Sequence, residues 1–479
     1  MFAVRMLLLS TGTVLSMCGC HQAARHQQSA VVHFDQGAPL AALEAFDHAS
    51  ESRHAEDEII AFDRAIAALA AGQPEVCETA VRETRKQIEF LSQKDLREST
   101  ASYVTDDQAI AWSGREFEQR MIDGIAILSS LVGNRQDAFA FAGQAMERIH
   151  EDQLALQEPV PADGSAVMTV GLVRQEIPPP PARLSPNAFS SWLQAVIQSE
   201  NPLNSELTAE ALHQVSYWRG ENPNADQTEF GAVRLGTGCG RGFGSVQVLT
   251  LTGRVTDWQT EHAEATSAAL LIADRILSAT SSHSLPPTLA PVPIAMPARH
   301  CSEQPFFTAA TVLTADRPEL LISHTLVDVN RAAFDSYLSG RDDQIARAVV
   351  RRIVKKGAVY AAKSQMNVSN NTGVDLLMNI AGVAWEAMEK ADTRHLTLLP
   401  ERVEALHMEL PAGDHQLLLG VNTQTAAGRP LNEQVSVRVP VRVEDGRNTL
   451  VLCFRPDVRF VCSILVSDGQ TPILIAASP

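Results

Sequence analysis

The stretch EIIAFDRAIAALAA (Glu58–Ala71) decides the fold class of the N-terminal part of this chain. Its large apolar side chains cluster toward one side at helical spacing. Gly72 and Pro74 follow, and glycine commonly ends a helix whereas proline commonly starts one. A second stretch with helical periodicity, Gln73–Leu91, comes next. The pattern therefore predicts two helices joined by a tight turn.

The same unit recurs further along, at Arg115–Leu131 and Asp137–His150. The turn glycines Gly37 and Gly72 lie 35 residues apart, close to the tetratricopeptide period of about 34 residues. The spacing to the next hairpin is longer, so the repeat is broken. We predict a short, degenerate tetratricopeptide-like array over residues 37–156, with an irregular helical bundle as the alternative.

The last ninety residues change from helical periodicity to alternation of apolar and polar side chains, which is typical of strands. Turn signals rich in Pro, Gly and Asp separate the alternating stretches. The pattern predicts a small β-sandwich over residues 393–479. The predicted strands are Val403–Leu410, His415–Val421, Val435–Val443, Thr449–Phe454 and Val458–Val466.

Between these parts, residues 157–186 are proline-rich and include four consecutive prolines, so we predict a linker there. Residues 187–392 form a mixed region with two long predicted helices, Val327–Gln365 and Val374–Met388. The predicted fold class is therefore α+β.

A basic string, Arg351, Arg352, Lys355 and Lys356, lies on the first of these long helices. Such a string is most often a solvated face. Contact with anionic lipid headgroups is the alternative.

The stretch LGTGCGRGFGS (Leu235–Ser245) is rich in glycine and suggests a phosphate-binding loop. It fits neither G-x-G-x-x-G nor the Gly-Lys-Ser/Thr ending of a P-loop, and it precedes a predicted strand (Val246–Val255). We predict a loop that enters a strand.

The chain begins like a bacterial lipoprotein export signal. A short positive region at Arg5 is followed by an apolar stretch, Met6–Val14, that is too short to span a bilayer. Cys20 follows a small residue, Gly19, so we predict that Cys20 is the lipidated cysteine, with Cys18 as the alternative.

This interpretation makes residues 1–19 a signal peptide and residues 20–36 a flexible polar tether. A plain secretion signal is the alternative. Two thiolates within an export signal lack partner ligands at a zinc spacing, so we do not predict a metal site there.

Export would place the remaining cysteines where disulfides persist. If Asp457 and Val458 centre a hairpin turn, Cys453 faces Cys462, and we predict a cross-strand disulfide between them. Two buried free thiols are the alternative. Cys239 with Cys301 is a looser second pairing.

Several short motifs resemble, in the same order, those of a family of uncharacterised bacterial lipoproteins. In that family an Ala-Asp-x-Arg-x-Trp-x-x-Leu-Pro block precedes a Leu-Pro-x-Gly turn, although Leu396 replaces the Trp here. The resemblance implies a lipid-anchored envelope protein with tetratricopeptide-like helices and no established reaction. The motifs are Ser113–Glu118, Pro291–Pro297, the helix around Asp328–Lys363, Ala391–Arg394, Leu399–Pro400 and Leu410–Gly413.

Asp392 and Arg394, within this block, are predicted to form a structural ion pair or a helix-end contact at the junction with the β module.

No catalytic motif is found, and we predict no catalytic residues, no cofactor and no metal site. The chain contains no H-E-x-x-H, G-x-S-x-G or C-x-x-C motif. His283, His300 and His324 lie near Cys301, but not at ligand spacing. The net charge of −17 disfavours nucleic-acid binding, because an acidic surface repels phosphates.

The sequence therefore favours a non-enzymatic protein of the bacterial cell envelope, anchored by lipid and facing the periplasm or the exterior. Helical hairpin arrays offer concave surfaces, so we expect other envelope proteins as partners. The alternatives are an envelope hydrolase with a dispersed site and a small-molecule or lipid binder. The oligomeric state is left open.

Overall fold

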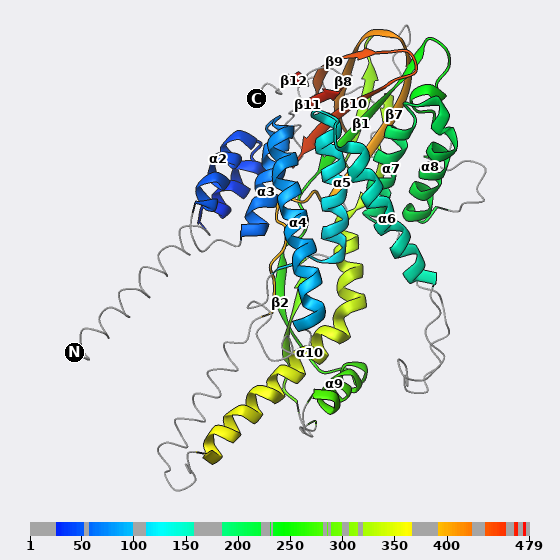
Figure 1. The fold of residues 1–479 in the computed structure, drawn as a ribbon. Coiled ribbons are helices and arrows are strands. Elements are labelled where there is room, and N and C mark those ends of the chain that lie inside the picture. Colours follow the sequence, from blue (N-terminus) through cyan, green and yellow to red (C-terminus); the bar gives the residue numbers. More distant parts are fainter. Residues whose placement is uncertain are drawn as a thin grey trace.

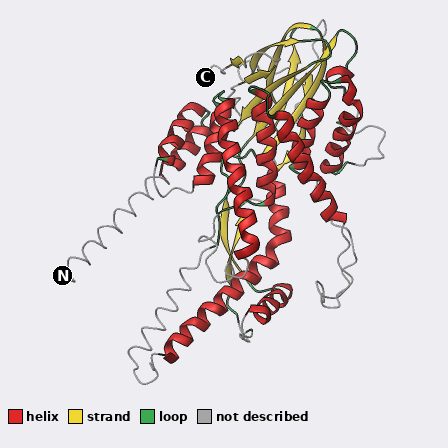
Figure 2. Ribbon diagram, viewed as in Figure 1, coloured by secondary structure: helices red, strands yellow, loops and turns green. Residues whose placement is uncertain are grey.

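A row of helices packs against β-sheets, so the chain is an α+β protein (Figures 1 and 2). The computed structural model describes residues 25–51, 57–98, 112–157, 184–221, 233–280, 289–298, 306–314, 320–365, 391–423 and 436–456, together with 230, 285, 464–467 and 473–475. The predicted helix Val374–Met388 and most of the predicted linker lie outside these residues.

Among the described residues, the helices from α2 to α8 follow one another along the chain, and each packs on the next (Figure 1). The predicted hairpin at Gly72 is present, since that glycine has a φ of 77° and Pro74 begins the following helix. The row extends past residue 156, where the sequence analysis ended it. Its helices are α2 (Pro39–Ser50), α3 (Asp57–Ala70), α4 (Pro74–Glu98), α5 (Glu116–Val132), α6 (Ala138–Gln157), α7 (Asn187–Gln198) and α8 (Ser205–Arg219).

A close approach joins the helical hairpin α5–α6 to the hairpin α7–α8. At Gly124 in α5, an added Cβ would lie 2.3 Å from the ring of Phe189 in α7. Only glycine leaves room for this ring, so the crossing of α5 and α7 depends on the missing side chain.

Residues 25–35 are helical and packed, so the predicted tether over residues 20–36 is wrong for this part. Ala30 and Phe34 are buried, and the ring of Phe34 meets that of Phe454 edge to face at 6.5 Å. Asp35 accepts a 2.8 Å hydrogen bond from Arg254. Ala30 and Phe34 are four residues apart and therefore lie on the same face of the helix, which packs against the protein although the surrounding sequence is polar.

Two sheets lie behind the helices (Figure 2). One has the order β12-β11-β10-β1-β7-β6 and the other β5-β4-β8-β9. The central strand β1 (Phe243–Thr252) runs parallel to β10 and antiparallel to β7. The other strands are β4 (Phe306–Val312), β5 (Leu320–Ile322), β6 (His324–Asp328), β7 (Arg402–Pro411), β8 (Gly413–Thr423), β9 (Val437–Val443), β10 (Asn448–Arg455), β11 (Ile464–Ser467) and β12 (Ile473–Ile475).

Strands from both sides of residue 392 share these sheets, which corrects the predicted division there. β1 lies between β7 and β10, and β4 pairs with both β5 and β8. The last ninety residues alone do not contain all the strands that complete the two sheets. Alternation shows where a strand is, but not which strands pair with it.

The two sheets bury a common apolar cluster. Val246 and Val248 of β1 point into it, together with Leu417 and Leu419 of β8. The other face of β1 carries Leu249 and joins the core beneath the helices. This strand is therefore covered on both sides, which explains its nearly continuous burial.

A buried carboxylate, Glu404 of β7, connects the two sheets. One oxygen accepts 2.9 Å from the guanidinium of Arg455, and the other accepts 2.8 Å from the amide of Thr308 and 2.7 Å from the hydroxyl of Ser323. Glu404 and Arg455 are almost fully buried. Burial lowers the pKa of Arg455, and the carboxylate of Glu404 opposes this effect.

A third unit contains the helix α9 (Ser267–Thr280), the strand pair β2 (Trp258–Ala263) and β3 (Val292–Pro297), and the long helix α10 (Val329–Gln365). The predicted helix Val327–Gln365 corresponds to α10.

The prediction of a solvated basic face on α10 is wrong for two of its residues. Arg351 and Arg352 are 3% and 8% exposed. The guanidinium of Arg352 donates to the carbonyls of Ala290 and Pro291. The side chains of Lys355 and Lys356 lie outside the described residues.

Candidate functional site

The irregular segment Ala391–Pro400 is contacted by charged side chains of two helices and of the loop before β2. It runs without helix or strand up to the start of β7. Leu396, Leu398 and Leu399 are at most 1% exposed and belong to the main apolar core. Because half of its side chains are buried and the others are partly buried, the backbone polar groups of this segment need partners inside the protein.

Asp63 of α3 supplies one set of partners. Its carboxylate accepts from the amide of Thr397 at 3.2 Å, from the amide of Leu398 at 2.9 Å, and from the hydroxyl of Thr397. Burial raises the pKa of Asp63 to about 6, although the hydrogen bonds from Thr397 and Leu398 act in the opposite direction. The carboxylate thus holds a turn of the segment at the cost of its own desolvation.

Glu118 of α5 supplies the next contact. One oxygen accepts 3.0 Å from the amide of Leu396, and the other accepts 2.7 Å from the amide of Arg115 at the start of the same helix. The second bond is the reach-back half of a capping box. One side chain therefore caps α5 and positions the segment.

Arg115 contacts the other end of the segment. Its guanidinium donates 2.7 Å to the carbonyl of Arg394 and 3.1 Å to that of Asp392. The same group stacks over the ring of Trp258 at 3.6 Å, a cation–π contact. Burial lowers the pKa of Arg115, against the effect of the carboxylates of Glu118 and Asp392.

Asp392 and Arg394 form an ion pair with each other. Nε of Arg394 donates to one carboxylate oxygen of Asp392 and Nη2 to the other, both at 2.8 Å. Arg115 of the helical row reaches both residues through their backbone carbonyls. The pair shapes the segment that Arg115 then recognises.

His395 lies on the side of the segment that faces the loop before β2. Its Nδ1 is 3.0 Å from the carbonyl of Thr393, and its Nε2 is 3.5 Å from the carboxylate of Asp257. Burial lowers the pKa of His395, but the partners Asp257 and Thr393 outweigh it and the net direction is upward. Arg254, in the same loop, donates 3.2 Å to the carbonyl of Thr397.

Taken together, three carboxylates and two guanidinium groups contact one short segment, and most of their bonds go to its backbone. Backbone contacts of this kind fix a conformation and do not generate a reactive group. The arrangement is therefore suited to positioning. Sequence analysis identified Ser113–Glu118 and Ala391–Arg394 as motifs but missed Asp63, whose signal was a carboxylate inside the apolar stretch Ile59–Ala71.

The glycine-rich loop before β1 enters a strand, as predicted, and its amides are bonded to groups of the protein itself. The amide of Gly240 donates 2.7 Å to Glu409, and that of Gly242 donates 2.8 Å to Asp445. The amide of Gly236 donates to Asn448 at 2.8 Å. These carboxylates and amides take the positions that an anion would need.

The predicted cysteine sites have different outcomes. Cys453 is buried and free, and Cys462 lies outside the described residues. The predicted hairpin register is wrong, because Leu452 pairs with Leu465, whereas the predicted turn would place Leu452 opposite Ser463. The connection between β10 and β11 covers more residues than a two-residue turn. The disulfide itself stays a prediction.

The remaining predicted sites mostly fall outside the described residues, namely Cys18, Cys20, His283, His300 and Cys301. Cys239 is a free, partly buried thiol, and burial raises its pKa to about 11. The ring of His324 packs edge to face on Phe230 at 6.2 Å. In the described part of the chain, no three metal-ligand side chains come together to hold an ion.

Comparison of the chain with known protein families, with curated proteins and with solved structures finds no match. Among the described helices, none is both long enough and apolar enough to cross a membrane.

Proposed function

We propose that this protein is a lipid-anchored component of the bacterial cell envelope that acts as a non-enzymatic scaffold and binds other envelope proteins. Cys20 carries the lipid in this proposal, and the apolar stretch before it is the export signal. The resemblance of its motif order to a lipoprotein family supports the same assignment.

One observation carries the proposal. The segment Ala391–Pro400, which contains the motif shared with that family, is held by buried groups of α3 and α5. The buried carboxylates of Asp63 and Glu118 thus connect the helices to the segment that leads into the sheets, and the connected parts share one apolar core. A stiff body of this kind suits a protein that positions partners.

The proposal includes a finer description of the fold. We propose that α3–α6 form a tetratricopeptide-like array, since α4 and α6 run in the same direction, with Arg82 bonded to Asp137 and Arg85 to Gln144. We also propose that the two sheets form a β-sandwich, because they bury a common apolar cluster.

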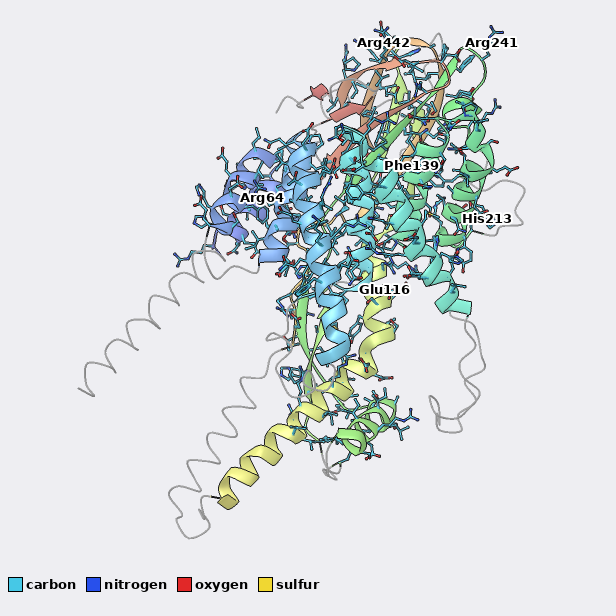
Figure 3. All side chains as sticks on the ribbon, viewed as in Figure 1. Arg64, Glu116, Phe139, His213, Arg241 and Arg442 are labelled. Carbon is cyan, nitrogen blue, oxygen red and sulfur yellow. The ribbon has the colours of Figure 1, made fainter. Side chains whose placement is uncertain are left out.

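One face of the helical array is already covered by the segment Ala391–Pro400, which limits where partners can bind. Asp63 of α3 and Glu118 of α5 already hold the segment Ala391–Pro400, so we propose that partners contact α4 and α6. Phe90 and Phe139, which lie on these helices, are 65% and 62% exposed, and Phe139 is labelled in Figure 3. Exposed aromatic side chains are favoured anchors in protein interfaces.

Cross-linking in detergent-solubilised envelopes, followed by affinity purification and mass spectrometry, tests the proposal. We expect a specific set of envelope proteins that is lost with the double variant Phe90→Ser and Phe139→Ser. Leu203→Ser is the matched control, because Leu203 is 88% exposed on a different helical hairpin. Capture of no specific partner, or equal loss with the control, contradicts the proposal.

A further inference from the structure

Residues 25–36 present a single outward stripe of exposed side chains. Ala30 and Phe34 point into the body, and Asp35 is bonded to Arg254. The exposed residues recur at helical spacing, so they share the opposite face. The outward stripe consists of Arg25, Gln28, Ser29, Val32 and Gln36.

The distance from the proposed lipid anchor to this helix is short. Only four residues, 21–24, separate Cys20 from Arg25. Even fully extended, the five steps from Cys20 to Arg25 span about 18 Å. A compact chain of this length has a radius of gyration of about 23 Å. The anchor therefore cannot let the body turn its far side to the bilayer.

The charge of the segment suits a bilayer surface. The whole chain has a net charge of −17, yet Asp35 is the single carboxylate side chain among residues 25–36. That carboxylate is paired with Arg254. Arg25, the first described residue, is exposed, and basic side chains are attracted to anionic headgroups.

We infer that the outward stripe lies against the lipid surface that holds the anchor, so that the body has one fixed orientation on the membrane. This inference rests on the proposed lipidation of Cys20. The contacts of Phe34 with Phe454 and of Asp35 with Arg254 couple the helix to the sheets and the loop after β1. The body therefore follows the orientation of the helix.

The opposite side of the molecule then faces away from the lipid. Arg64 on α3 and His213 on α8 lie on opposite sides of the helical row (Figure 3). Arg64 is bonded to Asp47 of α2, the helix that follows residues 25–36 in the chain. We expect α8 to project away from the bilayer.

Fluorescence resonance energy transfer, measured between a labelled residue of the protein and an acceptor on the lipid headgroups, tests this orientation. The full chain, produced in bacteria with its lipid, is reconstituted into phosphatidylethanolamine–phosphatidylglycerol vesicles that carry a headgroup-bound acceptor. A fluorescent amino acid replaces either Val32 or His213, which leaves the native cysteines untouched. A third protein has the label at position 32 and a twenty-residue Gly/Ser insertion after Ala24.

We expect transfer from position 32 to be several times that from position 213, and the insertion to remove most of this difference. Equal transfer from both positions in a protein shown by mass spectrometry to be lipidated overturns the inference and leaves the proposed anchor in place. Membrane association that survives Cys20→Ala, with no lipid on the chain, overturns both.

Discussion

The carboxylate of Asp63 in α3 accepts a 2.9 Å hydrogen bond from the amide of Leu398, a residue 335 positions further along the chain. This contact, together with the hydrogen bonds from Thr397 to the same carboxylate, joins the hairpin α3–α4 to the segment that leads into β7. Because the contact is fully buried, its loss leaves backbone amides without partners.

The first prediction concerns Asp63→Ala. The amides of Thr397 and Leu398 lose their acceptor in this variant, so we expect the free energy of unfolding to fall by about 3 kcal/mol in urea titrations. Asp343→Ala is the control, because the ion pair of Asp343 with Arg347 is half exposed and is worth less than about 1 kcal/mol. Similar losses in the two variants would show that Asp63 does not hold the segment.

The second prediction concerns pH. Burial raises the pKa of Asp63 from 3.8 to about 6, so the folded state binds this proton more tightly than the unfolded state. The contribution of Asp63 to stability is therefore largest below the unfolded value and is lost as the pH rises through about 6.

Urea titrations of the wild type and of Asp63→Asn at about pH 4.5 and about pH 7.5 check the sign. We expect the advantage of the wild type over the variant to shrink toward the higher pH, by about 2 kcal/mol between these two pH values. Other titrating groups, including His395, are common to both proteins. An advantage that grows with pH would mean that Asp63 is charged throughout this range.

The third prediction concerns Glu404→Gln. The amide keeps the size of the side chain but removes the charge that faces Arg455 inside the protein. Breaking a buried pair from one side typically costs about 3–5 kcal/mol, so we expect a large fall in thermal midpoint. Glu444→Gln, at an exposed position between β9 and β10, is the control and should leave the midpoint nearly unchanged. A small effect of Glu404→Gln would show that the connection between the sheets does not depend on the charge of Glu404.

The fourth prediction concerns Phe34→Ala. The side chain of Phe34 is 4% exposed and packs on Phe454, so its removal should weaken the attachment of residues 25–35. Truncating a buried Phe typically costs about 3–5 kcal/mol where the site cannot collapse. Limited proteolysis should cut the variant near residue 36 much faster than the wild type. Val32→Ala is the control, since Val32 is 47% exposed. Equal cleavage of both variants would contradict the packing of this helix.

The fifth prediction concerns Cys453. The sequence predicts a bond to Cys462, whereas the observed strand register pairs Leu452 with Leu465 and so differs from the register on which that prediction rests. Mass mapping of the exported protein without reduction separates the two cases. A peptide linked through Cys453 and Cys462 is the expected product if the predicted disulfide forms in the envelope. Alkylation of both thiols after unfolding, without prior reduction, would reject it.

The sequence by itself determined the kinds of element and many of their positions. Helical periodicity located the hairpin around Gly72 and the long helix α10, and alternation located β7 to β10. These signals are local, because each depends on which side chains share one face of one element. For the same reason, the motif residues Arg115 and Asp392 could be picked out, but not the contact between them.

The tertiary structure alone decided what these elements pack against. Strand β1 lies between β7 and β10, Asp63 holds a turn more than three hundred residues away, and residues 25–35 are seated on the sheet by Phe34. Partner choice depends on shape and on satisfying buried polar groups across long separations, and neither leaves a periodic trace in the chain. That is why a polar stretch predicted as a tether is instead part of the folded body.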